Sequence, residues 1–125
     1  MDLTGKNVIC YVRTYGYQKL YKELSELIVY CSTYGGKLHD PCLFYDLDSE
    51  SDDLRPGLDA VIQLVKNEDI DVVLVFSYHR IHLDYQKFNK IKEIFDENNV
   101  LIHSIGVEVI EKEGLFNDLR GKDKL

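Results

Sequence analysis

Short apolar runs alternate with longer amphipathic segments along the chain, and this alternation constrains the fold more than any other feature of the sequence. The runs at residues 7–12, 71–76 and 100–105 are short and rich in Val, Ile and Leu, as buried strands are. Residues 37–45 predict a further strand that is irregular around Pro41. Between these segments, apolar residues recur at helical spacing over residues 18–34, 55–65 and 85–98. This β-α-β-α-β-α-β order predicts an α/β fold with three layers, in which helices flank a mostly parallel sheet.

The 125 residues suit a single domain, with a core at about residues 7–105 and a short charged tail at residues 106–125. No apolar run is long enough to span a bilayer, and residues 1–6 do not resemble a signal peptide. We therefore expect a cytoplasmic protein without membrane contact. The three cysteines include no C-x-x-C pair, so we expect reduced thiols, no metal and no cofactor.

The arginines are few, and their positions are informative. Three of the four, Arg13, Arg55 and Arg80, fall near the carboxyl ends of predicted strands, which meet at one edge of a parallel sheet. Clustered guanidinium groups predict a phosphate-binding site. Alternatively, these arginines form a structural network with Asp46 and Asp48. The sequence leaves both interpretations open.

Two common functions of such folds are excluded by the residues that follow the strands. A response-regulator receiver needs acidic residues after its first strand and an aspartate after its third, where this chain has residues 13–15 and 77–79 without a carboxylate. A dinucleotide-binding domain needs a G-x-G-x-x-G motif after its first strand, and Gly16 stands there alone. The chain also lacks the lysine motif of a P-loop.

Four fragments in sequence resemble the catalytic domain of serine recombinases, the resolvases and invertases. Tyr11-Val12-Arg13-Thr14-Tyr15 resembles the family's first strand, and Phe44-Tyr45-Asp46 resembles the end of its second. Arg55-Pro56-Gly57-Leu58 matches the family's R-P-G-L helix start, and residues 71–81 look like its third strand and L-D-R-L turn. The resemblance extends over about residues 7–105, and each fragment has the expected order and spacing.

The chain departs from the family at the residues that carry its chemistry. In the family, a serine two residues after the first arginine attacks the DNA phosphodiester, and here that position is Tyr15. The aspartate before the third-strand arginine is replaced by His79, and a further arginine is replaced by Leu83. The Ser-Gly that follows the family's second strand has become Ser49-Glu50. Matching positions that are retained are Arg13, Gln18, Asp46, Arg55 and Arg80.

The resemblance implies a serine-recombinase-like protein of phage or mobile-element type, concerned with DNA recombination. Loss of the serine and of one arginine predicts an inactive member that acts by binding a protein, because phosphoryl transfer depends on positioned charge. A net charge of −7, and a tail too short for the family's long helix and DNA-binding region, predict weak or absent DNA binding. The alternative is a residual recombinase or nicking enzyme with Tyr15 as the nucleophile, aided by Arg13. The oligomeric state stays open.

The chain is rich in tyrosine, with nine tyrosines against five phenylalanines. Amphipathic aromatic side chains serve protein interfaces well, so a cluster near the carboxyl edge predicts a surface for the partner. The alternative is that these rings only border the core or cover a helix surface. The predicted interface residues are Tyr11, Tyr15, Tyr17, Tyr21 and Tyr78.

Overall fold

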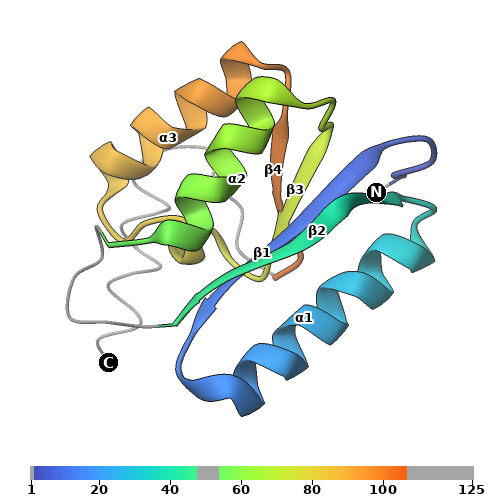
Figure 1. The fold of residues 1–125 in the computed structure, drawn as a ribbon, viewed down its shortest axis with the longest axis horizontal. Coiled ribbons are helices and arrows are strands. Elements are labelled where there is room, and N and C mark those ends of the chain that lie inside the picture. Colours follow the sequence, from blue (N-terminus) through green and yellow to red (C-terminus); the bar gives the residue numbers. More distant parts are fainter. Residues whose placement is uncertain (1, 48–53, 107–125) are drawn as a thin grey trace.

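In the computed structural model, which describes residues 2–47 and 54–106, four parallel strands form one sheet with helices on both faces (Figure 1). The strands are β1 (Asn7–Thr14), β2 (Lys37–Leu47), β3 (Val72–Val75) and β4 (Leu101–Ser104). The helices are α1 (Gly16–Thr33), α2 (Pro56–Asn67), α3 (Tyr85–Glu97) and the short 3-10 helix η1 (Tyr78–Arg80). The strand order is β2-β1-β3-β4. The predicted three-layer α/β fold is confirmed.

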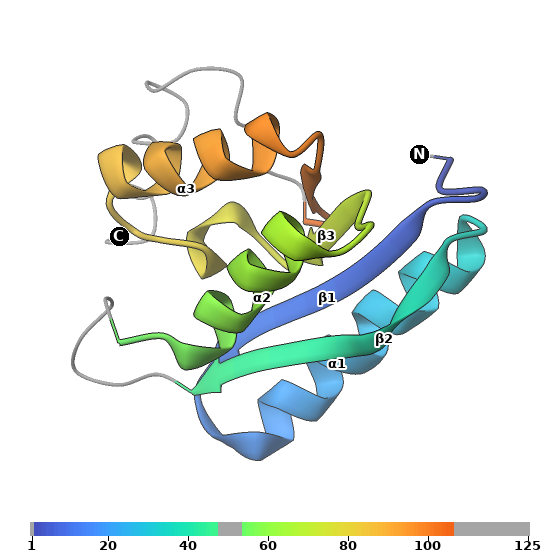
Figure 2. The same ribbon diagram turned by 45° about the horizontal axis from the view of Figure 1, so that its top comes forward.

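Strand β1 lies inside the sheet and divides the interior into two cores. Helices α2 and α3 cover one face of the sheet and α1 covers the other (Figure 2). Ile9 and Tyr11 belong to the core on the side of α2 and α3, whereas Val8, Cys10 and Val12 belong to the core beside α1. Each Val, Leu, Ile or Phe side chain that is fully buried in this way stabilises the fold by roughly 1.5–3 kcal/mol relative to an exposed one. The apolar faces of the helices complete these two cores. Val61 of α2 and Phe88 and Phe95 of α3 pack on one face of the sheet. Leu20, Leu27 and Cys31 of α1 pack on the other.

Strand β2 forms an edge of the sheet and is irregular around Pro41, as the sequence predicts. Val8 pairs with Leu38, but Cys10 pairs with Leu43, so β2 accommodates extra residues at this point. The Asp40–Pro41 peptide bond is cis. Beyond the irregularity, the register places Arg13 beside Asp46 where both strands end.

The element boundaries lie close to those predicted from periodicity. Helix α1 begins at Gly16, two residues before the start predicted at residue 18, because the apolar pattern reports buried positions and the first turn is exposed. Asp48, predicted as a partner of the arginines, and the predicted charged tail apart from Gly106 lie outside the described residues. No helix among residues 2–47 and 54–106 is long and apolar enough to cross a membrane.

Candidate functional site at the carboxyl edge of the sheet

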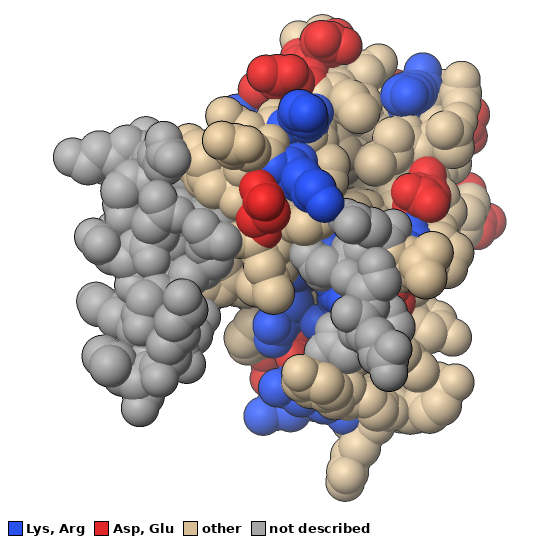
Figure 3. Space-filling model, turned by 90° about the vertical axis from the view of Figure 1, so that its left-hand side faces the viewer, with Lys and Arg blue, Asp and Glu red and all other residues tan. Residues whose placement is uncertain are grey.

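The side chains that the sequence singled out gather where β1, β2 and β3 end. Figure 3 looks at the molecule from the side where β1 and β2 end. Arg13 and Asp46 are the second-to-last residues of β1 and β2. Arg55 precedes α2, and Arg80 is the last residue of η1, which follows β3. The sheet topology therefore brings together residues that are up to 67 positions apart in sequence, from Arg13 to Arg80.

Asp46 is buried and holds the start of α2. Its carboxylate accepts hydrogen bonds from the backbone N–H groups of Gly57, at 2.7 Å, and Leu58, at 2.9 Å. These N–H groups have no acceptor within the helix, and the helix dipole favours a negative charge at this end. Asp46 also accepts a hydrogen bond of 2.6 Å from the hydroxyl of Tyr11. All of the acceptor contacts described for Asp46 are therefore structural.

Arg55 is buried against the same hydroxyl. Its Nε and Nη2 atoms donate to the Tyr11 oxygen at 3.2 Å and 2.8 Å, and its guanidinium carbon lies 5.6 Å from the Tyr11 ring centroid. Its Nη1 and Nη2 atoms also donate to the backbone carbonyls of Ile81 and Arg80. Burial raises the pKa of Tyr11 above its ordinary value, although the Arg55 charge opposes the shift. The phenol therefore stays protonated and links Arg55 to Asp46.

Arg80 is paired with a carboxylate of α1, the helix that covers the face of the sheet opposite to α2 and α3. Its Nη2 atom lies 3.1 Å from Oε2 of Glu23, a residue of α1 whose side chain is only 4% exposed, and its Nε atom lies 3.4 Å from Oε1. The guanidinium also lies 5.8 Å from the ring centroid of Phe76. A carboxylate as buried as Glu23 requires such a charged partner.

Sequence reasoning missed Glu23, although a signal was present. Glu23 lies three residues after Leu20 and four before Leu27, so the helical period places it on the buried face of α1. An acidic residue at such a position predicts a cationic partner from another element. The helical period does not identify this partner as Arg80, which is 57 residues away.

The guanidinium groups of Arg55 and Arg80 do not form one cradle for an anion. Arg55 bonds to Tyr11 on the face of α2 and α3, whereas Arg80 bonds to Glu23 on the face of α1. Arg13 is buried at the end of β1, beside Asp46. The geometry favours the structural network for Arg55 and Arg80, with Tyr11 and Glu23 as partners. Phosphate binding at Arg13, Arg55 and Arg80 stays a prediction.

The positions that depart from the family are open to solvent or lie near the surface. Tyr15 directly follows β1 at the start of α1 and is 74% exposed. Leu83 is half exposed, and His79 is partly buried within η1.

His82 is buried, and its Nδ1 atom accepts a hydrogen bond of 2.9 Å from the backbone N–H of Asp84. Among the residues that the structure describes, no group of three or more His, Cys, Asp or Glu side chains could hold a metal ion.

The predicted tyrosine surface is only partly exposed. Tyr11 is fully buried, because β1 is covered on both faces, so its assignment to an interface was wrong. Tyr78 is half-buried, with its ring centroid 5.9 Å from that of Phe88. Tyr15, Tyr17 and Tyr21 are exposed, so they remain available for the predicted role.

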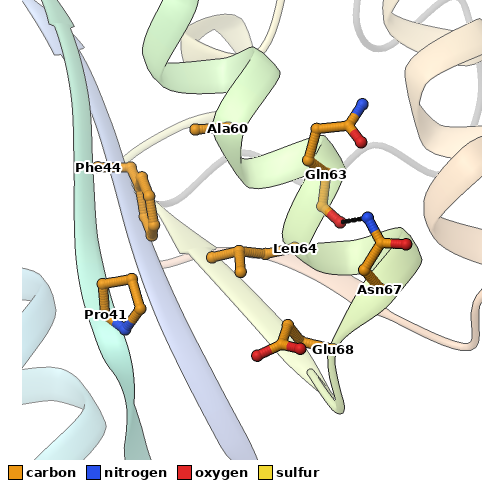
Figure 4. Close-up of a pocket in the computed structure, with 7 residues that line it drawn as sticks. All are labelled: Pro41, Phe44, Ala60, Gln63, Leu64, Asn67 and Glu68. Atoms are coloured by element: carbon orange, nitrogen blue, oxygen red, sulfur yellow. Dashed lines mark hydrogen bonds between the residues drawn. The ribbon is translucent and has the colours of Figure 1, made fainter.

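Two hollows of the surface differ in character. One, of about 600 Å³, lies between the first half of α1 and Arg80, and its lining includes Lys19, Lys22 and Phe76. The other, of about 370 Å³, lies between β2 and α2, where Pro41 and Phe44 face Leu64 (Figure 4). Glu68 is the one charged residue in the lining of the second hollow. Only the first hollow combines several charged groups with an aromatic ring.

The comparisons with known proteins agree with the fold and the motifs. A family model described as the resolvase N-terminal domain matches residues 8–118. The catalytic domain of ISC1926 TnpA, an IS607-like serine recombinase, is 24% identical, with a TM-score of 0.71 over 93% of this chain and 77% of that chain. The N-terminal catalytic domain of TP901-1 integrase is 20% identical, with a TM-score of 0.70 over 95% of both chains.

A third similar structure, the first ORF in transposon ISC1904 from Sulfolobus solfataricus P2, is 19% identical, with a TM-score of 0.63 over 94% of this chain and 80% of that chain. A comparison with curated proteins gave no match. At these identities the structural similarities establish the fold, and the family model adds the sequence signature over most of the chain. The chain therefore belongs to the serine recombinase family, through its resolvase N-terminal domain.

Proposed function

We propose that this serine recombinase domain no longer transfers DNA strands and acts by binding a protein partner. The observation that carries the proposal is the internal engagement of the arginines. Arg55 donates to Tyr11 and to two backbone carbonyls, and Arg80 is paired with the buried Glu23. Donors used in this way do not stabilise the charge that develops on a phosphate in the transition state.

The substitutions at the matching family positions support the same proposal. Tyr15 stands in place of the serine nucleophile, and Leu83 supplies no cation. Removing a single electrostatic donor from an active site typically lowers kcat by about 10²–10³. Because the nucleophile and one donor are replaced together, we expect no measurable strand transfer.

Binding to a protein is supported by the exposed tyrosines of α1. Tyr17 and Tyr21 are 55% and 63% exposed, and their ring centroids lie 6.3 Å apart. Tyrosine provides a large contact area at a low cost in side-chain entropy and is enriched at the centres of interfaces. A partner that covered both rings would bury apolar surface that water now contacts.

A second candidate function is strand cleavage by Tyr15. Its exposure at the carboxyl end of β1, two residues after Arg13, is the observation that favours it. A phenolic oxygen lies farther from the backbone than a serine oxygen, however. The attacking geometry would have to be rebuilt around it, and a displacement of about 1 Å can lower a rate 100-fold.

The two functions are distinguished by incubating the full chain with supercoiled plasmid and quenching with detergent. We expect no nicking, no covalent protein–DNA adduct, and identical results for Tyr15→Phe and for the neighbouring control Tyr17→Phe. Duplex DNA should bind with a Kd of about 10⁻⁵ M or weaker at physiological salt. An adduct that is lost in Tyr15→Phe but kept in Tyr17→Phe would overturn the proposal and establish the tyrosine chemistry.

A further inference from the structure

Helix α1 carries all of its charge on one side. Its charged residues fall within an arc of about 100° round the axis, because each residue of an α-helix advances by about 100°. These residues are Lys19, Lys22, Glu23 and Glu26. Glu23 is paired with Arg80, which follows β3, so the charged side faces β3. Because α1 packs on β1, and β2 lies on the other side of β1 from β3, the uncharged side of α1 faces β2.

Aromatic and apolar side chains occupy this uncharged side of α1. Tyr17, Tyr21 and Ile28 lie within about 40° of one another round the helix axis, and the two tyrosine ring centroids are 6.3 Å apart. Both tyrosines are more than half exposed, and Ile28 is half-buried. Ser25 and Ser32, which adjoin them round the helix, add no charge. Successive turns of α1 therefore present uncharged side chains in one direction.

The edge strand β2 continues this surface. Leu43 and Tyr45 pair with Cys10 and Val12 of β1, which belong to the core beside α1, so they lie on the face of the sheet that α1 covers. They are nevertheless 41% and 45% exposed, so α1 leaves them partly uncovered. Helix α1 runs alongside β2 in both views of the ribbon (Figures 1 and 2). We call the combined surface the uncharged face, and it consists of Tyr17, Tyr21, Ile28, Leu43 and Tyr45.

The uncharged face offers enough area for a specific contact. A fully covered tyrosine buries about 150–250 Å², so the exposed parts of Tyr17, Tyr21 and Tyr45 offer roughly 250–400 Å². That is about a third to a half of the roughly 800 Å² that each partner buries in an interface of ordinary size. Leu43, Ile28 and the backbone at the edge of β2 add to it. Contiguous apolar surface of this kind marks interaction sites, whereas isolated apolar residues do not.

We propose that the uncharged face binds the same face of a second copy of this chain, with the two β2 strands antiparallel across a twofold axis. The inference rests on the proposed function, because it names a second copy as the protein partner. Among the described strands, β2 pairs with β1 alone, so its outer edge can accept a further strand. A twofold axis perpendicular to the sheet makes the two strands antiparallel and leaves both α1 helices on one face. There the tyrosines of the two copies meet.

Charge and strand geometry both favour a second copy at this face. Each copy has a net charge of −7, so contact through a charged surface would bring like charges together. The uncharged face lets two copies meet without burying a charge. The register between β1 and β2 is regular over residues 43–47, beyond the irregularity at Pro41. Asp46 is the one charged residue of that segment, and its carboxylate is turned to the start of α2. An antiparallel pair that uses the whole segment is centred on Tyr45.

The first test measures the mass of the full chain in solution by light scattering and sedimentation over a range of concentrations. We expect a dimer that dissociates on dilution. Tyr21→Glu places a carboxylate in the contact and should raise the dissociation constant of the dimer at least tenfold, which is about 1.4 kcal/mol. The matched control is Val29→Glu, which adds the same charge to α1 at a residue that is 62% exposed, against 63% for Tyr21. Val29 lies roughly opposite the buried Leu27, on the side of α1 turned away from the sheet, so its variant should dimerise within twofold of the unaltered chain.

The second test locates the contact by cross-linking. Side chains directly opposite each other in an antiparallel pair have Cβ atoms about 4.5–5.5 Å apart. In a Cys42→Ser background, Tyr45→Cys should therefore form a disulfide between two copies under mild oxidation, and Val29→Cys should not. Circular dichroism first shows that all variants fold.

Three results would overturn the inference. They are a monomer at every concentration, equal weakening by Tyr21→Glu and Val29→Glu, and cross-linking of Tyr45→Cys no faster than that of Val29→Cys. None of these results depends on the plasmid assay, which tests the loss of strand transfer, so the failure of either proposal is recognised separately.

Discussion

At the scale of single residues, the site is defined by which buried charge has which partner. Glu23 is buried in α1, and its contact with Arg80 is the ion pair that compensates this burial. Arg80 is about one quarter exposed, so water screens part of the interaction. Removal of Arg80 would leave the carboxylate uncompensated in the interior. The pair is therefore a matter of stability, and this can be tested without knowing the function.

Arg80→Ala should lower the melting temperature by several degrees, for a loss of roughly 1–3 kcal/mol, whether or not phosphate is present. Adding Glu23→Gln to Arg80→Ala should recover part of the loss, because a neutral amide is less costly to bury than an unpaired carboxylate. Differential scanning fluorimetry with and without inorganic phosphate measures both effects. If Arg80→Ala instead removed a phosphate-dependent stabilisation and left the phosphate-free melting temperature unchanged, Arg80 would belong to an anion site.

At the scale of elements, the junction between β2 and α2 explains the Arg55-Pro56-Gly57 sequence. The Arg55 guanidinium donates hydrogen bonds to the backbone carbonyls of residues 80 and 81. Pro56 occupies the first turn of α2, where a backbone N–H would have no acceptor within the helix. Gly57 lies against β2 so closely that a Cβ atom there would collide with the carbonyl of Tyr45 and lie 2.9 Å from the carboxylate of Asp46. The absence of a side chain therefore lets Asp46 reach the start of the helix.

Gly57→Ala tests this junction by whether it raises or lowers the free energy of unfolding. Helix propensity alone would make alanine more stable than glycine by up to about 1 kcal/mol. The collision with Tyr45 should instead destabilise the fold by roughly 1–3 kcal/mol and weaken the capping by Asp46. Urea unfolding measures the difference, with Gln63→Ala on the exposed side of α2 as the control, expected within about 0.5 kcal/mol of the unaltered chain. A stabilising Gly57→Ala would contradict the described junction.

At the scale of the whole molecule, a sheet covered on both faces buries titratable groups at its centre. Burial raises the pKa of Cys10 from 9.0 to about 12, and it also raises the pKa of Tyr11. Both groups are neutral when protonated. The unfolded chain therefore releases these protons at a lower pH than the folded chain does. Stability from this source is complete below pH 9 and is lost as pH rises toward 12.

The free energy of unfolding should therefore decrease by about 1.4 kcal/mol per pH unit for each such group, above the pH at which that group ionises in the unfolded chain. Between about pH 9 and pH 10 the thiols dominate, since tyrosine ionises later. Urea midpoints measured across this range should show a shallower decrease for Cys10→Ala than for the unaltered chain. An equal slope in Cys10→Ala would show that Cys10 is not protected from ionisation.

The sequence by itself determined the order of the elements, the covering of both faces of the sheet by helices, and the family. Strand and helix patterns report which side of each element is apolar, and the carboxyl-edge rule placed Arg13, Asp46, Arg55 and Arg80 near one another. The tertiary structure alone decided what those residues contact. It buried Tyr11 between Arg55 and Asp46, and it gave Arg80 the carboxylate of Glu23 rather than of Asp46. A local pattern fixes the face on which a side chain lies, whereas a hydrogen bond depends on how distant elements pack, and periodicity contains no information about that packing.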